Sequence, residues 1–249
     1  PRLPFFMAAV AAAVTVILTW RTLTESLTPE QRMKNRMARS NGLRPAQVVR
    51  NTSLLAVLLI AFVGQFALGL LQATFALYGD AVLFADYSDS IVDLGIGVLL
   101  ATVGLSQFLT QTVLIRRVLP RFGEVNLVII GGLVRSVGMF FFAAATTPWL
   151  GLPGSVFFAL GMGLMMPPLQ SLSTRTVADE VRGGVLGLYQ STVSLATIFS
   201  TALGGIIFAQ NPRYPYWIGM ALSLLALVPA YFFLRRPLRK SRSETAVYK

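Results

Sequence analysis

Long apolar stretches alternate with short polar segments along almost the whole chain. Each stretch has roughly 20 residues, the length that an α-helix needs to cross the hydrocarbon core of a bilayer. Buried helices of soluble proteins are usually shorter, so the pattern predicts membrane-spanning helices rather than a soluble core. We expect about seven of them, over residues 3–20, 52–78, 94–115, 125–145, 150–172, 185–209 and 216–234.

The predicted fold class follows from this pattern: an all-α, polytopic membrane helix bundle with about seven transmembrane helices. Four parts are expected along the chain. They are a transmembrane helix over 1–20, a basic cytoplasmic linker over 21–51, a six-helix transmembrane domain over 52–234 and a basic cytoplasmic tail over 235–249.

Basic residues collect in alternate polar segments, which gives the predicted bundle an orientation. The linker, the loop around 116–121, the link around 175–182 and the tail hold nearly all lysines and arginines. The segments between them, including an acidic loop around 80–93, hold almost none. Cytoplasmic loops of membrane proteins carry the excess of Lys and Arg. The basic side, with the C-terminus, is therefore predicted to be cytoplasmic.

Composition agrees with a membrane protein and removes nucleic acid as an expected partner. Only 12% of the 249 residues are charged, whereas soluble domains have about 25%. The mean hydropathy is +0.67. A net charge of +11 would suit nucleic acid, but these charges lie between apolar stretches, as the positive-inside rule expects of loops. The lipid bilayer is the expected partner.

Several classes of chemistry are excluded by missing residue types. The chain has no cysteine and no histidine, which excludes disulfides, thiolate or imidazole metal sites, cysteine nucleophiles and Ser-His catalysis. No Asp or Glu lies in the middle of a predicted span, so no acid–base pair can be placed there. We therefore predict a protein that is not an enzyme and has no cofactor and no metal site.

Polar side chains line one face of each of three predicted helices. These are Gln65 and Gln72, Gln107 and Gln111, and Gln190, Ser194, Thr197 and Thr201. Polar groups in the hydrocarbon layer are costly and usually face the bundle interior or a water-filled path. Alternatively, they only join helices to one another by hydrogen bonds. Aligned stripes on three helices favour a shared aqueous cavity.

Arg135 is the only charge deep within a predicted span. It can serve function, as intramembrane charges often do, be a structural arginine bonded to backbone carbonyls, or snorkel to the cytoplasmic face. Met162 and Met166 lie in a Gly- and Pro-rich span; such side chains repack around varied apolar ligands, or simply fill a kinked helix. The candidate substrate path is Gln65, Gln72, Gln107, Gln111, Arg135, Met162, Met166, Gln190 and Ser194.

Short motifs in a fixed order resemble a known family. They are Leu3–Phe6 with Thr24–Glu30, Phe75–Tyr78, Ile96–Ala101 with Gly104–Gln107, Arg121–Glu124, and Pro168–Ser173 with Glu180–Gly187. Together they resemble the C-terminal half of a major facilitator superfamily transporter, preceded by its sixth helix, of the tetracycline-efflux type of bacterial drug–proton antiporter. The Asp of the family's loop motif is not seen before Arg121, where Arg116 and Arg117 stand.

The resemblance implies a secondary active transporter that moves small organic solutes or drugs by alternating access between two halves, with proton-coupled efflux in a bacterial inner membrane. It implies a gating loop formed by Arg116, Arg117, Arg121 and Gly123. A lone half cannot enclose the cavity, so we expect a fragment, a split product or one piece of an assembly whose partner is the missing N-terminal half. The alternative is a non-transport membrane subunit that uses a half-transporter bundle to bind protein or lipid.

Overall fold

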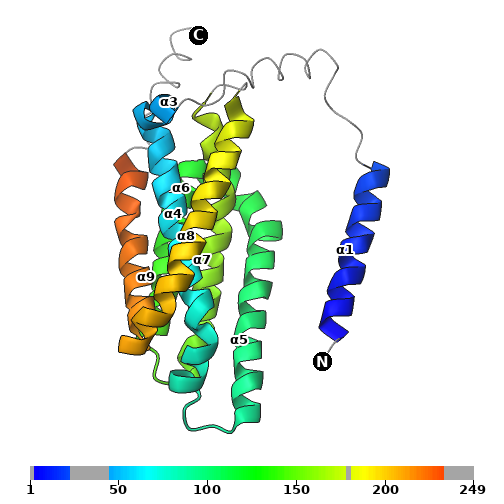
Figure 1. The fold of residues 1–249 in the computed structure, drawn as a ribbon, viewed down its shortest axis with the longest axis vertical. Helices are drawn as coiled ribbons and strands as arrows, with labels where there is room; N and C mark the ends of the chain where they lie inside the picture. The colour runs from blue at the N-terminus through cyan, green and yellow to red at the C-terminus, as the bar shows by residue number, and fades with distance from the viewer. Residues whose placement is uncertain (1–2, 23–44, 178–180, 233–249) are drawn as a thin grey trace. The chain divides into compact units, whose positions relative to one another are not determined.

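The computed structural model describes residues 3–22, 45–177 and 181–232, and every element in them is helical, which confirms the all-α prediction. The elements are α1 (Leu3–Thr22), α3 (Pro45–Arg50), α4 (Thr52–Tyr78), η1 (Gly79–Leu83), α5 (Asp89–Leu109), η2 (Thr110–Leu114), α6 (Ile115–Ala144), α7 (Pro148–Arg175), α8 (Arg182–Gln210) and α9 (Tyr214–Leu225) (Figure 1). Most of the predicted linker and all of the predicted tail fall outside the described residues.

Helix α1 belongs to a unit of its own, residues 1–42, and the remaining helices belong to a second unit, residues 43–249. Its 20 residues are almost all apolar, and the side chains described along it are exposed. Residues Phe5–Thr22 are long and apolar enough to cross a membrane. An apolar surface of this kind is stable only in lipid or against another apolar surface.

The second unit contains the other membrane-length helices. By length and hydropathy the described residues hold 6 candidate spans, and the longest, Asp89–Ala144, has 56 residues. That length is enough for two crossings at 1.5 Å per residue. A turn inside it therefore reconciles 6 continuous stretches with about seven predicted transmembrane helices.

The turn lies at Gly123, which has φ +74° and ψ 163°. An L side chain rarely adopts such a backbone conformation, so glycine is required there. The packing on α7 shows that the chain reverses direction. Before the turn, Leu99 meets Gly151 and Thr110 meets Gly163, so this part of the chain runs parallel to α7. After the turn, Gly131 meets Gly161 and Gly138 meets Phe158, so the chain now runs antiparallel to α7.

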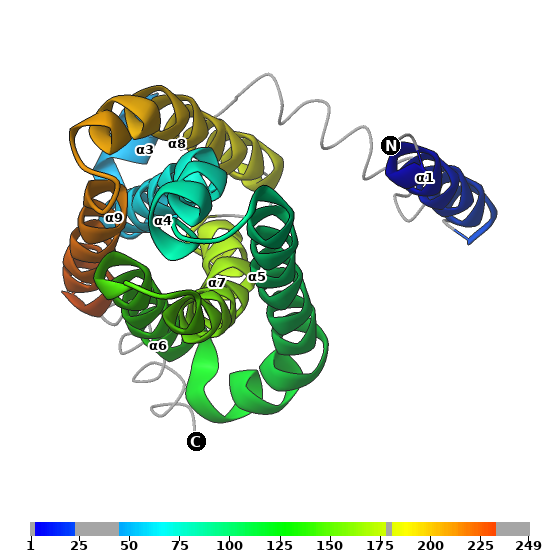
Figure 2. The same ribbon diagram turned by 90° about the horizontal axis from the view of Figure 1, so that it is seen from below.

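Small residues allow α6 and α7 to approach closely, which forms the core of the bundle. A Cβ atom on Gly138 would lie 2.3 Å from the backbone nitrogen of Phe158, and one on Gly131 would lie 2.8 Å from the Gly161 carbonyl oxygen. Glycine at a helix crossing lets two backbones pack together in this way. Seen end on, α5, α6, α8 and α9 lie around α4 and α7 (Figure 2).

Two π-helical turns flank α5 and were not predicted. Segment η1 lies in the predicted acidic loop, and η2 interrupts the predicted span 94–115. Such turns insert an extra residue into a helix and are frequent at functional sites. Between them, α5 packs chiefly on α7, where Leu99 meets Gly151, and Thr110 of η2 meets Gly163 further along the same helix.

Candidate transport surface

The polar stripes of α4 and α8 lie next to each other. The Gln65 Nε2 donates a hydrogen bond to the Thr197 Oγ1 at 3.1 Å. One turn further along α4, a Cβ on Gly69 would lie only 1.9 Å from the Ser200 Oγ, so only glycine allows the two helices to approach this closely. The α4–α8 contact therefore joins two of the three predicted stripes.

Most of the α8 stripe faces away from the packed bundle. Helix α8 buries Val185, Tyr189, Ala196, Ser200 and Gly204 on one side. The polar residues Gln190, Ser194 and Thr201 are exposed on another side. Open space also surrounds three glycines of α8: a Cβ added to any of them would have no neighbour within 4 Å. These are Gly183, Gly187 and Gly205. We call Gln65, Gln72, Gln190, Ser194, Thr197 and Thr201 the polar face.

The glutamines on α4 take two different environments. Gln65 is half-buried and bonded to α8, whereas Gln72, two turns further on, is exposed. Gln107 on α5 is half-buried and Gln111 in η2 is exposed. These last two residues lie on α5 and η2, which pack on α7, and in the described part of the chain no hydrogen bond joins them to the polar face.

Arg135 lies inside the bundle and has 0% of its surface exposed. Its Nη1 donates to the Gly64 carbonyl at 3.1 Å and lies 3.6 Å from the Met162 Sδ, and its Nη2 donates to the Ser223 Oγ at 2.9 Å. The geometry favours the predicted alternative of an arginine bonded to a backbone carbonyl. A solute cannot touch this side chain while the helices remain packed.

The two methionines of the predicted path also lie in the packing. Met162 is buried, and the half-buried Met166 accepts a weak hydrogen bond from the Tyr189 hydroxyl, 3.8 Å from its sulfur. Helix α7 continues through Pro167 and Pro168 to Arg175 without a break. The methionines thus fill the core between α4, α6, α7 and α8.

The predicted gating loop is helical on both sides of Gly123. Arg116, Arg117 and Arg121 are exposed on the first part of α6. Sequence reasoning gave no role to the residue after the turn, Glu124, although it completes the motif Arg121–Glu124.

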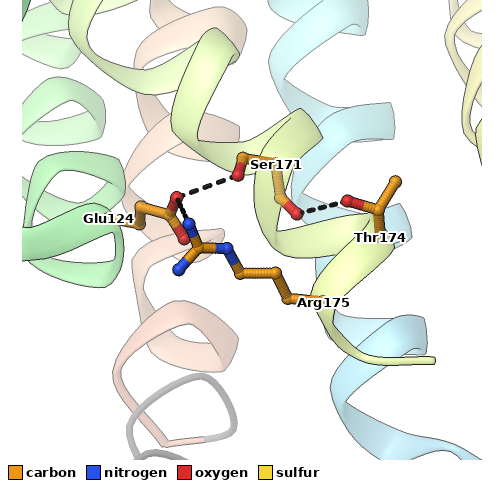
Figure 3. A network of polar contacts seen from close by, with 4 residues as sticks. All are labelled: Glu124, Ser171, Thr174 and Arg175. Carbon is orange, nitrogen blue, oxygen red and sulfur yellow. Dashed lines mark hydrogen bonds and ion pairs between the residues drawn. The ribbon is translucent and has the colours of Figure 1, made fainter. Parts of the chain in front are cut away.

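Glu124 ties the start of the second α6 segment to the end of α7 (Figure 3). Its Oε1 accepts a hydrogen bond from the Ser171 Oγ at 2.8 Å and lies 3.2 Å from the Arg175 Nη2. The side chain of Glu124 is 13% exposed and that of Arg175 is 66% exposed. The amide of Asn51, the N-cap of α4, donates to the Thr176 carbonyl at 2.9 Å. Three helices are therefore joined at this end of the bundle.

A second polar cluster joins α4, α6 and α9 at the opposite end. The Tyr78 hydroxyl donates to the Phe142 carbonyl, and the Tyr78 and Tyr216 rings lie 4.4 Å apart between centroids. The Thr74 Oγ1 lies 3.4 Å from the Tyr216 hydroxyl, and Arg213 donates to the Ala145 carbonyl at 3.3 Å. Hydroxyl and carbonyl groups that are buried here are satisfied by one another, as burial requires.

An apolar hollow of about 270 Å³ lies apart from the polar face, between the starts of α5 and α7. Tyr87 and Trp149 line it together with aliphatic side chains such as Leu94 and Val98. Tyr and Trp are enriched where membrane proteins cross the bilayer interface. Its lining suits lipid chains, so we do not include it in the candidate site.

Known proteins resemble this chain over most of its length. A family profile described as Major Facilitator Superfamily matches residues 70–247. Multidrug resistance protein 1 of Bacillus subtilis (strain 168) is 26% identical over 238 residues, which are 92% of this chain and 58% of that protein. Tetracycline resistance protein, class C, of Escherichia coli is 28% identical over 218 residues, 88% of this chain and 53% of that protein. The chain spans little more than half the length of these relatives.

Proposed function

Because this chain belongs to the Major Facilitator Superfamily, we propose that it supplies the C-terminal six-helix half, with one preceding helix, of a secondary active transporter. The transporter exports small organic solutes or drugs across the bacterial inner membrane by alternating access. Relatives named for multidrug and tetracycline resistance support drugs as the solute class. Proton coupling rests on the resemblance to drug–proton antiporters.

The polar face is the observation that carries this proposal. An amide that faces lipid finds no hydrogen-bond partner there, at a cost of several kcal/mol in order of magnitude, and a hydroxyl can bond only back to the carbonyls of its own helix. A helix with Gln190, Ser194 and Thr201 on its unpacked side is therefore stable only against water, a solute or a polar partner. A solute pathway between two transporter halves provides all three.

The chemistry of the polar face indicates how a solute is held. Gln72, Gln190, Ser194 and Thr201 are exposed and offer neutral donors and acceptors. Gln65 and Thr197 are bonded to each other, which leaves further donor and acceptor capacity on the amide. We assign solute recognition in this half to hydrogen bonds from amides and hydroxyls, with Gln107 and Gln111 of α5 and η2 on a second wall of the path.

The inner gate is assigned to the end of the bundle that carries the basic residues. Arg116, Arg117, Arg121 and Gly123 form the gating loop, and the contact of Glu124 with Arg175 ties that loop to α7. The positive-inside rule places this end, together with the C-terminus, on the cytoplasmic side. The N-terminal half is the partner against which this end closes.

The test uses the transporter that contains this chain, in bacterial cells without drug pumps of their own, with ethidium and tetracycline as probes. Gln190→Leu and Ser194→Ala should each reduce efflux roughly three- to tenfold, because each removes a hydrogen bond to the solute. Phe199→Leu is the control: it lies about 140° around α8 from Ser194 and is exposed on a different side of the helix.

Equal efflux by all three variants would remove the polar face from the transport path. Absence of efflux from the unmodified protein, with correct insertion, would favour the alternative of a membrane subunit that binds protein or lipid without transport.

A further inference from the structure

Hydrogen bonds between α9, α6, α4 and α8 cross the bundle and meet at two adjacent residues of α4. Ser223 of α9 accepts from the Arg135 Nη2 at 2.9 Å, and the Nη1 of the same arginine donates to the Gly64 carbonyl of α4 at 3.1 Å. The next residue, Gln65, donates to Thr197 of α8 at 3.1 Å. Arg135 is thus linked through one residue of α4 to the polar face, which it does not itself touch.

Packing alone does not explain an arginine at this position. The side chain is fully buried, its Nε has no hydrogen-bond partner, and its partners in the described part of the chain are a carbonyl, a hydroxyl and a thioether. An apolar side chain of similar volume often fills such a site with equal or greater stability. The charge therefore points to a role that an apolar residue cannot perform.

Gly64 is fitted to this contact. A Cβ there would lie 3.0 Å from the Arg135 Nη1 and 2.9 Å from the Met166 Cε, closer than an ordinary contact. A carbonyl oxygen has two lone pairs, so it can accept from the guanidinium while it accepts from the amide one helical turn later. The guanidinium therefore holds α4 from inside the bundle without breaking the helix.

We propose that Arg135 is a positioning residue: by holding the Gly64 carbonyl it fixes the rotation and depth of α4, and so places Gln65 against Thr197 on the polar face. Consecutive residues of a helix lie about 100° apart, so an inward pull on residue 64 sets the direction of residue 65. The proposal rests on the proposed function, because it assigns Gln65 and Thr197 to solute recognition.

The first test is kinetic and uses ethidium efflux by the full transporter. Arg135→Met should raise KM about tenfold with a smaller change in maximal rate, whereas Arg135→Lys, which keeps a donor for the carbonyl, should recover most of the affinity. In a Gln65→Leu background, Arg135→Met should raise KM no further, because both changes remove the same contact. Tyr78→Phe is the control, since it removes a buried hydrogen bond between α4 and α6 far from Gln65. It should lower Tm without a change in KM.

The second test reads the position of α4 against α8 without transport. The chain has no cysteine, and a Cβ on Gly204 would lie 3.2 Å from the Ala73 Cβ, near the separation of a disulfide. In the Ala73→Cys, Gly204→Cys protein, disulfide formation should be several times slower with Arg135→Met and unchanged with Tyr78→Phe.

The two tests separate the proposals. An unmodified protein that does not export ethidium contradicts the proposed function, and the cross-linking rates then decide the role of Arg135. Unchanged cross-linking in Arg135→Met, or KM increases that multiply in the double variant, would overturn the positioning role.

Discussion

The substitution Gly161→Ala is expected to separate α6 from α7. A Cβ on residue 161 would lie 2.3 Å from the backbone nitrogen of Arg135, 2.5 Å from the Gly131 carbonyl oxygen and 2.6 Å from the Arg135 Cβ. The nitrogen and the oxygen belong to residues four apart, the spacing of one backbone hydrogen bond of α6. Neither atom can move aside by a change of rotamer, so the helices themselves must shift.

The size of the effect follows from these distances. Non-bonded heavy atoms reach their best separation at about 3.5–4.0 Å, so the backbones must part by about 1 Å at this crossing. A gap of that size loses a quarter to a half of each neighbouring dispersion contact, and overpacking typically costs about 1–3 kcal/mol. Alanine recovers up to about 1 kcal/mol of helix propensity. We expect a net loss of about 2 kcal/mol in the free energy of unfolding.

The assay is reversible unfolding of the chain in mixed micelles with increasing SDS, followed by circular dichroism. Gly187→Ala is the matched control, because it makes the same change on α8 where an added Cβ has no neighbour within 4 Å. It should be neutral or slightly stabilising. A Gly161→Ala protein within about 0.5 kcal/mol of the unmodified chain would refute the close backbone contact of α6 and α7 at this crossing.

Three further substitutions test the ends of the bundle in the same unfolding assay. Gly123→Ala should cost about 1–3 kcal/mol through backbone strain alone, because the position has φ +74° and open space around it; no change would mean that α6 does not turn there. Glu124→Gln should cost at most about 1 kcal/mol and lose that effect at high salt, because Arg175 is 66% exposed; a salt-independent loss would contradict an exposed ion pair. Tyr216→Phe should cost about 1 kcal/mol because it leaves Thr74 without that contact, and an unchanged midpoint would show that the contact is not formed.

Much of the fold was open to prediction because bilayer thickness sets the length of each helix. The apolar stretches located the membrane helices, and the reversal at Gly123 falls in the basic loop predicted between spans 94–115 and 125–145. The resemblance based on short motifs is confirmed by the family match over residues 70–247. The π-helical turns were not predictable, because no periodicity distinguishes η2 from the helix that precedes it.

The candidate site was predictable only in part. Helical periodicity showed that Gln190 and Ser194 share a face, but it could not show that this face is exposed or that α8 lies beside α4. Partners distant in sequence decide those facts, as they do for Glu124, whose hydrogen-bond partner Ser171 lies 47 residues away. Arg135 was recognisable as unusual from its position, but its partners lie on three other helices.

The distinction between a polar group that recognises a solute and one that supports it therefore depends on packing. Arg135 and Gln190 both lie within helices long and apolar enough to span a membrane, where polar groups lose solvation, and the charged Arg135 loses more than the neutral Gln190. Hydrogen bonds inside the bundle replace the lost water around Arg135. Gln190 is exposed, so its amide needs hydrogen bonds from water, a solute or a protein partner. Gln65 stands between the two: it is half-buried, bonded to Thr197, and adjacent to the carbonyl that Arg135 holds. A change at Gln65 should therefore alter both solute affinity and the α4–α8 contact, whereas a change at Gln190 should alter affinity alone.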